Sequence, residues 1–85
     1  MGQLRQLPNI GPVLEKQLSK VGINSYQQLQ DHGAEQAWLK IQAIDDSACI
    51  NRLLALEGAI QGVAKALLPD QRKAELKQFY QQHKL

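Results

Sequence analysis

One short turn near the N-terminus has the residue pattern of an anion-binding corner. In the stretch LPNIGPVLEKQLSKVGI, Asn9, Ile10 and Gly11 precede Pro12, and a helix-like run continues to Gly22. The first backbone N–H groups of a helix have no partner within it and carry partial positive charge, so they can hold a phosphate. Two interpretations follow: a cradle for a nucleic-acid phosphate, or a tight corner between two helices.

The turn resembles a helix–hairpin–helix motif. In that motif a glycine, an apolar residue and a second glycine join two short helices, with a leucine on either side of the turn. Asn9 stands where the first glycine is usual, and asparagine tolerates the left-handed backbone conformation better than most other residues. The residues expected to build the motif are Leu7, Pro8, Ile10, Gly11, Leu18 and Gly22.

The charges near the turn favour the corner over the cradle. Many DNA-binding members of this superfamily carry a lysine where this chain has Val13, and Glu15 puts a carboxylate beside the phosphate position. The nearby bases are Arg5, Lys16 and Lys20, and a lysine pair four residues apart is also typical of a solvated helix face. If the turn binds the DNA backbone, the residues expected to make the contact are Asn9, Gly11, Val13, Lys16 and Lys20.

The composition indicates a single folded domain over residues 1–85. Apolar residues make up 44% of the chain and charged residues 21%, and the formal charge of +2 at pH 7 provides little attraction for nucleic acid. Cys49 is the only cysteine, so no intramolecular disulfide can form. No apolar run is long enough to cross a bilayer. We expect a cytoplasmic protein that needs no membrane, metal or cofactor.

Glycine and proline divide the chain into helical segments, and strand signals are almost absent. We expect an all-α fold, a compact bundle of five to six short helices. A short turn is expected over residues 3–6, followed by a helix from Pro12 to Gly22 and by a helix that is capped by Ser25 with Gln28 and ends at Gly33. In the next helix, Trp38 and Ile41 are expected to face the core, and Ile44 is a further candidate. A long helix is then expected over residues 48–68, with Asp45, Asp46 or Ser47 as its N-terminal cap, and a last helix is expected from Pro69.

Two rows of side chains run along the predicted long helix. The first is a core stripe of Leu53, Leu56, Ile60, Val63 and Leu67. The second contains only small residues, namely Ala55, Gly58, Gly62 and Ala66. Because a mid-helix glycine costs roughly 0.5–1 kcal/mol relative to alanine, we expect another helix backbone to approach the two glycines closely. Packing within the domain is favoured over a homodimer seam.

Glu57 lies at the edge of the core stripe, and a structural role is favoured for it. Its carboxylate could accept hydrogen bonds from free N–H groups at the hairpin, or pair with a base such as Arg52 or Lys65.

No arrangement of residues predicts catalysis. His32 and His83 are far apart in sequence, and Cys49 has no local signature of a nucleophile. We therefore expect no enzyme activity.

The order of several short runs points to one family. LPNIGP is followed by VGI, SYQQL, HGAEQAW and finally LLALEGAIQG, so that the pattern covers about Leu4 to beyond Leu68. This order resembles the C-terminal domain of the TfoX/Sxy competence regulators. The resemblance implies a positive regulator of natural transformation and DNA-uptake genes that acts with the cyclic-AMP receptor protein or RNA polymerase.

Two hypotheses remain open. In the first, the chain is a non-catalytic regulatory module that acts through protein contacts. In the second, the hairpin binds the DNA backbone without reading sequence.

Overall fold

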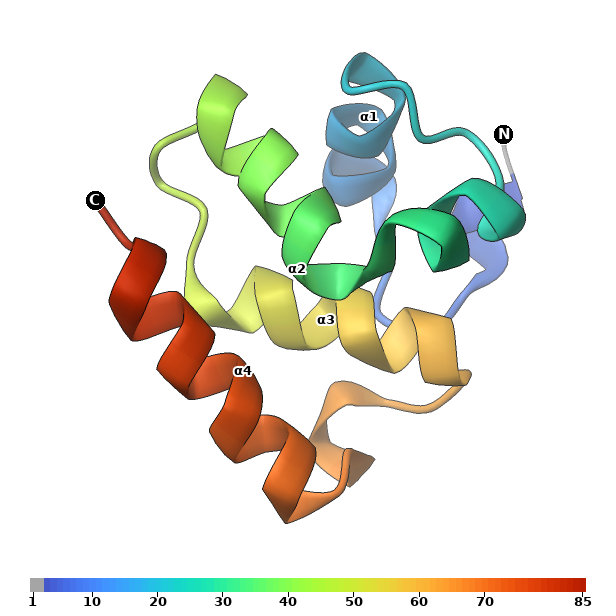
Figure 1. Cartoon of the computed structure of the whole chain (residues 1–85). Helices are drawn as coiled ribbons and strands as arrows, with labels where there is room; N and C mark the ends of the chain where they lie inside the picture. The colour runs from blue at the N-terminus through green and yellow to red at the C-terminus, as the bar shows by residue number, and fades with distance from the viewer. Residues whose placement is uncertain (1–2) are drawn as a thin grey trace.

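The computed structural model describes residues 3–85, and that range is entirely helical apart from its connections. The elements are a 3-10 turn η1 (Gln3–Gln6), α1 (Pro12–Lys20), α2 (Tyr26–Ile44), α3 (Ile50–Gln61), a second 3-10 turn η2 (Lys65–Leu67) and α4 (Asp70–His83). In Figure 1, α3 runs across the middle of the molecule, with α1 and α2 on one side and α4 on the other. The all-α prediction is confirmed, but four α-helices and two 3-10 turns replace the expected five to six helices.

Helix α1 begins and ends where its sequence signals predict. Pro12 is its first residue, and Gly22 adopts a left-handed conformation with φ of 87° just after its end. Ile23 N–H donates to Leu18 O at 2.8 Å and Gly22 N–H to Ser19 O at 3.1 Å, the bond pair of a glycine-capped helix end. Because Ile23 and Leu18 are both fully buried, the cap also closes over the core.

Helix α2 consists of two segments that meet at Gly33. The Ser25 hydroxyl accepts a hydrogen bond from Gln28 N–H at 3.1 Å, which starts the first segment as expected. Gly33 has φ of 78° and ψ of 162°, a backbone conformation almost restricted to glycine. The expected break is therefore present as a bend within one element.

The prediction of a long helix over residues 48–68 is wrong at both ends, because α3 covers Ile50–Gln61. Its N-terminal cap is Cys49, without a side-chain hydrogen bond, because Asp45 instead closes the end of α2 and accepts Ser47 N–H at 3.0 Å. Its C-terminal end comes at Gly62, which is left-handed with φ of 78°. Val63 N–H then donates to Gly58 O at 2.9 Å and the chain reverses.

The core is centred on Trp38. Its indole is fully buried, its Nε1–H donates to Cys49 O at 3.2 Å, and the rings of Phe79 and Tyr80 from α4 meet it edge-on. Leu53 and Leu56 of the predicted stripe are also fully buried.

Two residues predicted to face the core do not. Leu67 is 73% exposed because it lies beyond the break at Gly62, and Ile44 is 51% exposed at the last position of α2. None of the helices within residues 3–85 has the length and apolar character needed to span a membrane.

Candidate functional site

The N-terminal turn joins η1 to α1. Ile10 N–H donates to Leu7 O at 3.4 Å, and the Ile10 side chain is buried. Asn9 has φ of 70° and is the one non-glycine residue with positive φ among residues 3–85. It therefore takes up the conformation that the hairpin motif usually assigns to glycine.

The side chain of Asn9 points into the domain. Its Nδ2 donates to Val63 O at 3.0 Å, and its Oδ1 accepts Lys65 N–H at 3.1 Å. These bonds fasten the turn to the segment that follows α3. The amide of Asn9, one of the residues expected to contact DNA, thus forms hydrogen bonds within the protein itself.

Gly58 makes room for this attachment. A Cβ at Gly58 would lie 2.7 Å from Val63 O and would collide with the Asn9 amide. The close approach expected at this glycine is present, but the neighbours are Asn9 and the chain reversal rather than another helix. Gly62 has open space around it, and its left-handed φ accounts for a glycine there.

Glu15 and Arg5 tie the start of α1 to η1. Arg5 Nε donates to Glu15 Oε1 at 3.0 Å, and the backbone N–H of Arg5 donates to Oε2 at 3.2 Å. The negative charge of Glu15 therefore neutralises the positive charge of Arg5, one of the bases near the turn.

The remaining residues predicted to contact DNA are divided between two places. Asn9, Gly11 and Val13 line a shallow hollow beside the turn, together with Arg52 and Lys65 among others. Lys16 and Lys20 are exposed on α1 but do not line this hollow.

Of the two bases that line the hollow, Arg52 is ion-paired, whereas Lys65 has no ion pair within residues 3–85. Val13 is 68% exposed at its edge, and Arg52 pairs with Asp45 at 2.8 Å. Gly11 has φ of −95°, a conformation open to other residues. A phosphate here would meet a valine side chain where a lysine is usual in the motif.

Glu57 faces α4 and takes part in an ion cluster around Arg72. Arg72 Nη2 lies 2.9 Å from Glu57 Oε1, and its two terminal nitrogens bind both oxygens of Glu35 at 2.9 and 3.0 Å. The hydrogen bonds that Arg72 donates to Glu57 and then to Glu35 raise the pKa of Arg72, and the bond to Glu35 lowers the pKa of that carboxyl group. Gln61 donates to the other oxygen of Glu57. The cluster joins α2, α3 and α4.

Glu57 pairs with a base, which was one of the two expected arrangements, but the base is Arg72 rather than Arg52 or Lys65, because α4 packs against α3 and brings Arg72 to it. Arg52 turns instead toward Asp45. No pattern local to Glu57 indicates a partner on a helix that begins at Asp70.

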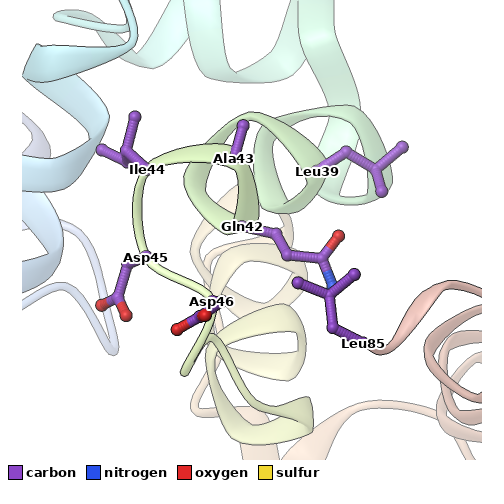
Figure 2. Close-up of a pocket in the computed structure, with 7 residues that line it drawn as sticks. All are labelled: Leu39, Gln42, Ala43, Ile44, Asp45, Asp46 and Leu85. Atoms are coloured by element: carbon purple, nitrogen blue, oxygen red, sulfur yellow. The ribbon is translucent and has the colours of Figure 1, made fainter.

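A second hollow, which sequence reasoning missed, lies at the C-terminal end of α2. Figure 2 shows Asp45 and Asp46 on the loop that leaves the helix, and Leu85 beside Gln42. Its volume is about 570 Å³, and its lining residues are Leu39, Gln42, Ala43, Ile44, Asp45, Asp46 and Leu85. We call it the acidic hollow. In the sequence, the one pattern that could have indicated this hollow is an apolar residue, Ile44, directly followed by the two acidic residues Asp45 and Asp46.

Asp45 forms the rigid side of the acidic hollow. Its carboxylate accepts hydrogen bonds from the hydroxyl and N–H of Ser47, from Arg52 and from Gln17. These bonds, that of the Ser47 hydroxyl first and that of Arg52 next, hold the pKa of Asp45 well below its usual range.

Fold and site together define a small all-α domain whose N-terminal hairpin turn is anchored by an asparagine to the end of the central helix. The chain belongs to the TfoX C-terminal domain family, whose model matches residues 1–80. It is 36% identical over 77 residues to Protein Sxy of Escherichia coli (strain K12), a match covering 91% of this chain and 37% of Sxy.

Two crystal structures from Listeria monocytogenes share the fold. An uncharacterised protein in a triclinic form matches with a TM-score of 0.92 and 47% identity over 93% of this chain and 90% of that one. A protein of unknown function in a tetragonal form matches with a TM-score of 0.89 and 46% identity, over 92% and 96% of the two chains. The resemblance expected from the quoted runs is thus confirmed at the level of the family.

Proposed function

We propose that this domain is a non-catalytic regulatory module of the competence-regulator type, which acts by binding a protein of the transcription machinery. Membership of the TfoX C-terminal domain family and the likeness to Sxy support this role. The partner proposed from the family is the cyclic-AMP receptor protein or RNA polymerase, and the proposed location is the cytoplasm. Because the chain spans 37% of the length of Sxy, the role concerns this domain and not a whole regulator.

The observation that carries the proposal is the use of the hairpin's polar groups inside the domain. The Asn9 amide bonds to Val63 and Lys65, and Arg5 bonds to Glu15. Val13 provides no charge for a phosphate. DNA affinity depends on neutralising several phosphates and releasing their counterions. The ten lysines and arginines of this chain are nearly balanced by eight acidic residues, so its net charge is only +2.

The arrangement of the histidines supports a non-catalytic role. The ring of His32 lies 2.8 Å from Gln28 O and that of His83 lies 2.8 Å from Phe79 O, each on its own helix. Both rings therefore sit against the backbone one turn earlier. Neither arrangement pairs a base with a nucleophile.

A second candidate function, binding of the DNA backbone by the hairpin, has two observations in its favour. The left-handed Asn9 reproduces the turn of a hairpin motif, and Lys16 and Lys20 are exposed on the helix that follows. The first N–H groups of α1 would then meet a phosphate.

A DNA titration separates the two functions. Fluorescence anisotropy of a labelled duplex would be followed at about 50 and about 200 mM salt, since electrostatic DNA binding weakens steeply over that range. We expect no saturable binding at the lower salt. Salt-sensitive binding that is lost in Lys16→Gln/Lys20→Gln would overturn the proposal in favour of the hairpin. Lys77→Gln/Lys84→Gln, which removes the same charge from exposed positions at the other end of the chain, is the matched control.

A further inference from the structure

Exposed apolar side chains gather at the acidic hollow. Ile44 is 51% exposed and Leu85 is 87% exposed, and both line it together with the partly buried Leu39. The other large apolar side chains of comparable exposure in residues 3–85, Val13 and Leu67, lie outside it. Adjacent exposed apolar side chains around a hollow are typical of an interaction site rather than of a solvated surface.

The charged side chains that line this hollow are both acidic, and one of them, Asp45, is paired with Arg52 outside the lining. Asp45 and Asp46 line it, and no lysine, arginine or histidine does. Helix α2 ends there, and the last carbonyl groups of a helix carry partial negative charge. The nearest bases in sequence, Lys40 and Lys84, are not part of the lining.

The two carboxylates differ in what they can offer to a partner. Asp45 is held by Ser47, Arg52 and Gln17, whereas Asp46 is exposed and has no ion pair within the described part of the chain. Asp46 and the helix end therefore remain to attract a cation, and they repel a nucleic-acid phosphate.

Hydrogen bonds fix the position of both walls. Gln42 Nε2 donates to His83 O at 2.9 Å, which holds the end of α4 against α2. Asp45 fixes the loop after α2 to α1 and α3 through Gln17 and Arg52. A surface that is already ordered loses less conformational entropy when a partner binds.

We infer that the acidic hollow docks a segment of a protein partner that carries a lysine or arginine next to an apolar side chain. The apolar side chain packs on Ile44 and Leu39, and the cation lies against Asp46 and the end of α2. This inference rests on the proposed function, because it assigns a surface and a partner chemistry to the protein contact.

The test measures binding of purified cyclic-AMP receptor protein and of RNA polymerase to the 85-residue chain and to three variants of it. Ile44→Asp and Asp46→Lys alter the acidic hollow. Val13→Asp is the matched control for Ile44→Asp, since it places the same new charge on another exposed apolar residue, which lies beside the hairpin. We expect the first two variants to weaken binding at least about tenfold and the third to change it less than about twofold. Thermal unfolding of each variant verifies that it is folded.

Any other pattern of binding overturns the inference, and the pattern shows whether the proposed function fails as well. Unchanged binding by Ile44→Asp and Asp46→Lys overturns the inference and leaves the proposed function standing. Stronger binding by Asp46→Lys overturns it too, because the partner segment would then be acidic. Loss of binding in Val13→Asp alone moves the docking surface to the hairpin. If the unaltered chain binds neither protein, the proposed function fails and the inference fails with it.

Discussion

Replacing Arg72 with methionine tests how the fourth helix is held to the rest of the domain. Arg72 provides charged hydrogen bonds to Glu57 and Glu35, and Glu57 is only 7% exposed. Without Arg72, the buried carboxylate of Glu57 keeps the hydrogen bond donated by Gln61. Methionine preserves much of the length and apolar stem of the side chain, so the substitution mainly removes the charge.

The expected loss of stability is large for a single surface-accessible residue. Breaking a fully buried ion pair by removing one partner costs about 3–5 kcal/mol, and the partial exposure of Arg72 and Glu35 reduces this to about 2–4 kcal/mol. For a domain of this size that corresponds to a fall in melting temperature of roughly 10–25 °C. Urea unfolding followed by the fluorescence of Trp38 measures the free energy directly.

The stability lost in Arg72→Met should depend on pH, because Arg72 changes the pKa of Glu35. Arg72 lowers the folded pKa of Glu35, so the stabilisation is present above the unfolded pKa of about 4.3 and is lost as the pH falls through the lower, folded value. The difference between the unaltered chain and Arg72→Met should therefore be greatest near neutral pH and shrink as the pH falls below about 4.

Two further variants complete the design. Adding Glu57→Gln to Arg72→Met removes the unpaired charge and should restore about 1–2 kcal/mol. Lys77→Met removes an exposed cation from the same helix and should cost less than about 0.5 kcal/mol. A loss below about 1 kcal/mol for Arg72→Met, or a loss independent of pH, would refute the structural role of the cluster.

Three other predictions concern the hairpin and the end of α2. Asn9→Ala removes the side-chain hydrogen bonds of Asn9, including those with Val63 and Lys65, and puts alanine at a φ of 70°. Unfolding in urea should therefore show a loss of about 2–4 kcal/mol, and a loss under about 1 kcal/mol would mean that the side chain does not anchor the turn. Gly58→Ala should destabilise by about 1–3 kcal/mol although alanine favours helices, because its Cβ meets Val63 O and the Asn9 amide; a stabilised variant would contradict the packing. Hydrogen bonds from Ser47 and Arg52 lower the folded pKa of Asp45, so the stabilisation that Asp45 provides is present above its unfolded pKa of about 3.9 and is lost as the pH falls. The melting temperature of Asp45→Asn should therefore vary less than that of the unaltered chain between about pH 5 and pH 2. Equal pH dependence of the two melting temperatures would argue against this role of Asp45.

The start of the fold follows from local signals in the sequence. Pro12 and Gly22 bound α1, and Ser25 with Gln28 starts α2, because each of these residues acts on backbone groups within one helical turn. Asn9 could be assigned a left-handed conformation from its place in the hairpin pattern, where a glycine is usual, and from the tolerance of asparagine for that conformation. Such features do not require knowledge of which helices meet.

The predictions that were wrong concern contacts between segments that are far apart in the sequence. Gly62 was interpreted as a packing position, whereas it ends α3 so that the chain can return to Asn9. The bond from Asn9 to Val63 spans 54 residues, and no local pattern predicts it. For the same reason the partner of Glu57 could not be identified before the path of α4 was known.

The structure also explains why two of the runs that carried the family resemblance occur together. Asn9 of LPNIGP lies against Gly58 of LLALEGAIQG, and a larger residue at position 58 would displace its amide. The turn and the central helix therefore constrain each other. The acidic hollow lacks such a signature, because single exposed residues such as Ile44 and Asp46 become a surface only when the ends of α2 and α4 lie close together.

The central claim is that this domain binds a protein and not the DNA backbone. It is tested most directly by titrating the labelled 85-residue chain with cyclic-AMP receptor protein, with RNA polymerase and with duplex DNA in the same buffer, at about 50 mM salt where DNA binding is favoured. Our account predicts saturable binding to at least one of the two proteins and none to the duplex. Saturable binding to the duplex, with neither protein bound, would contradict it.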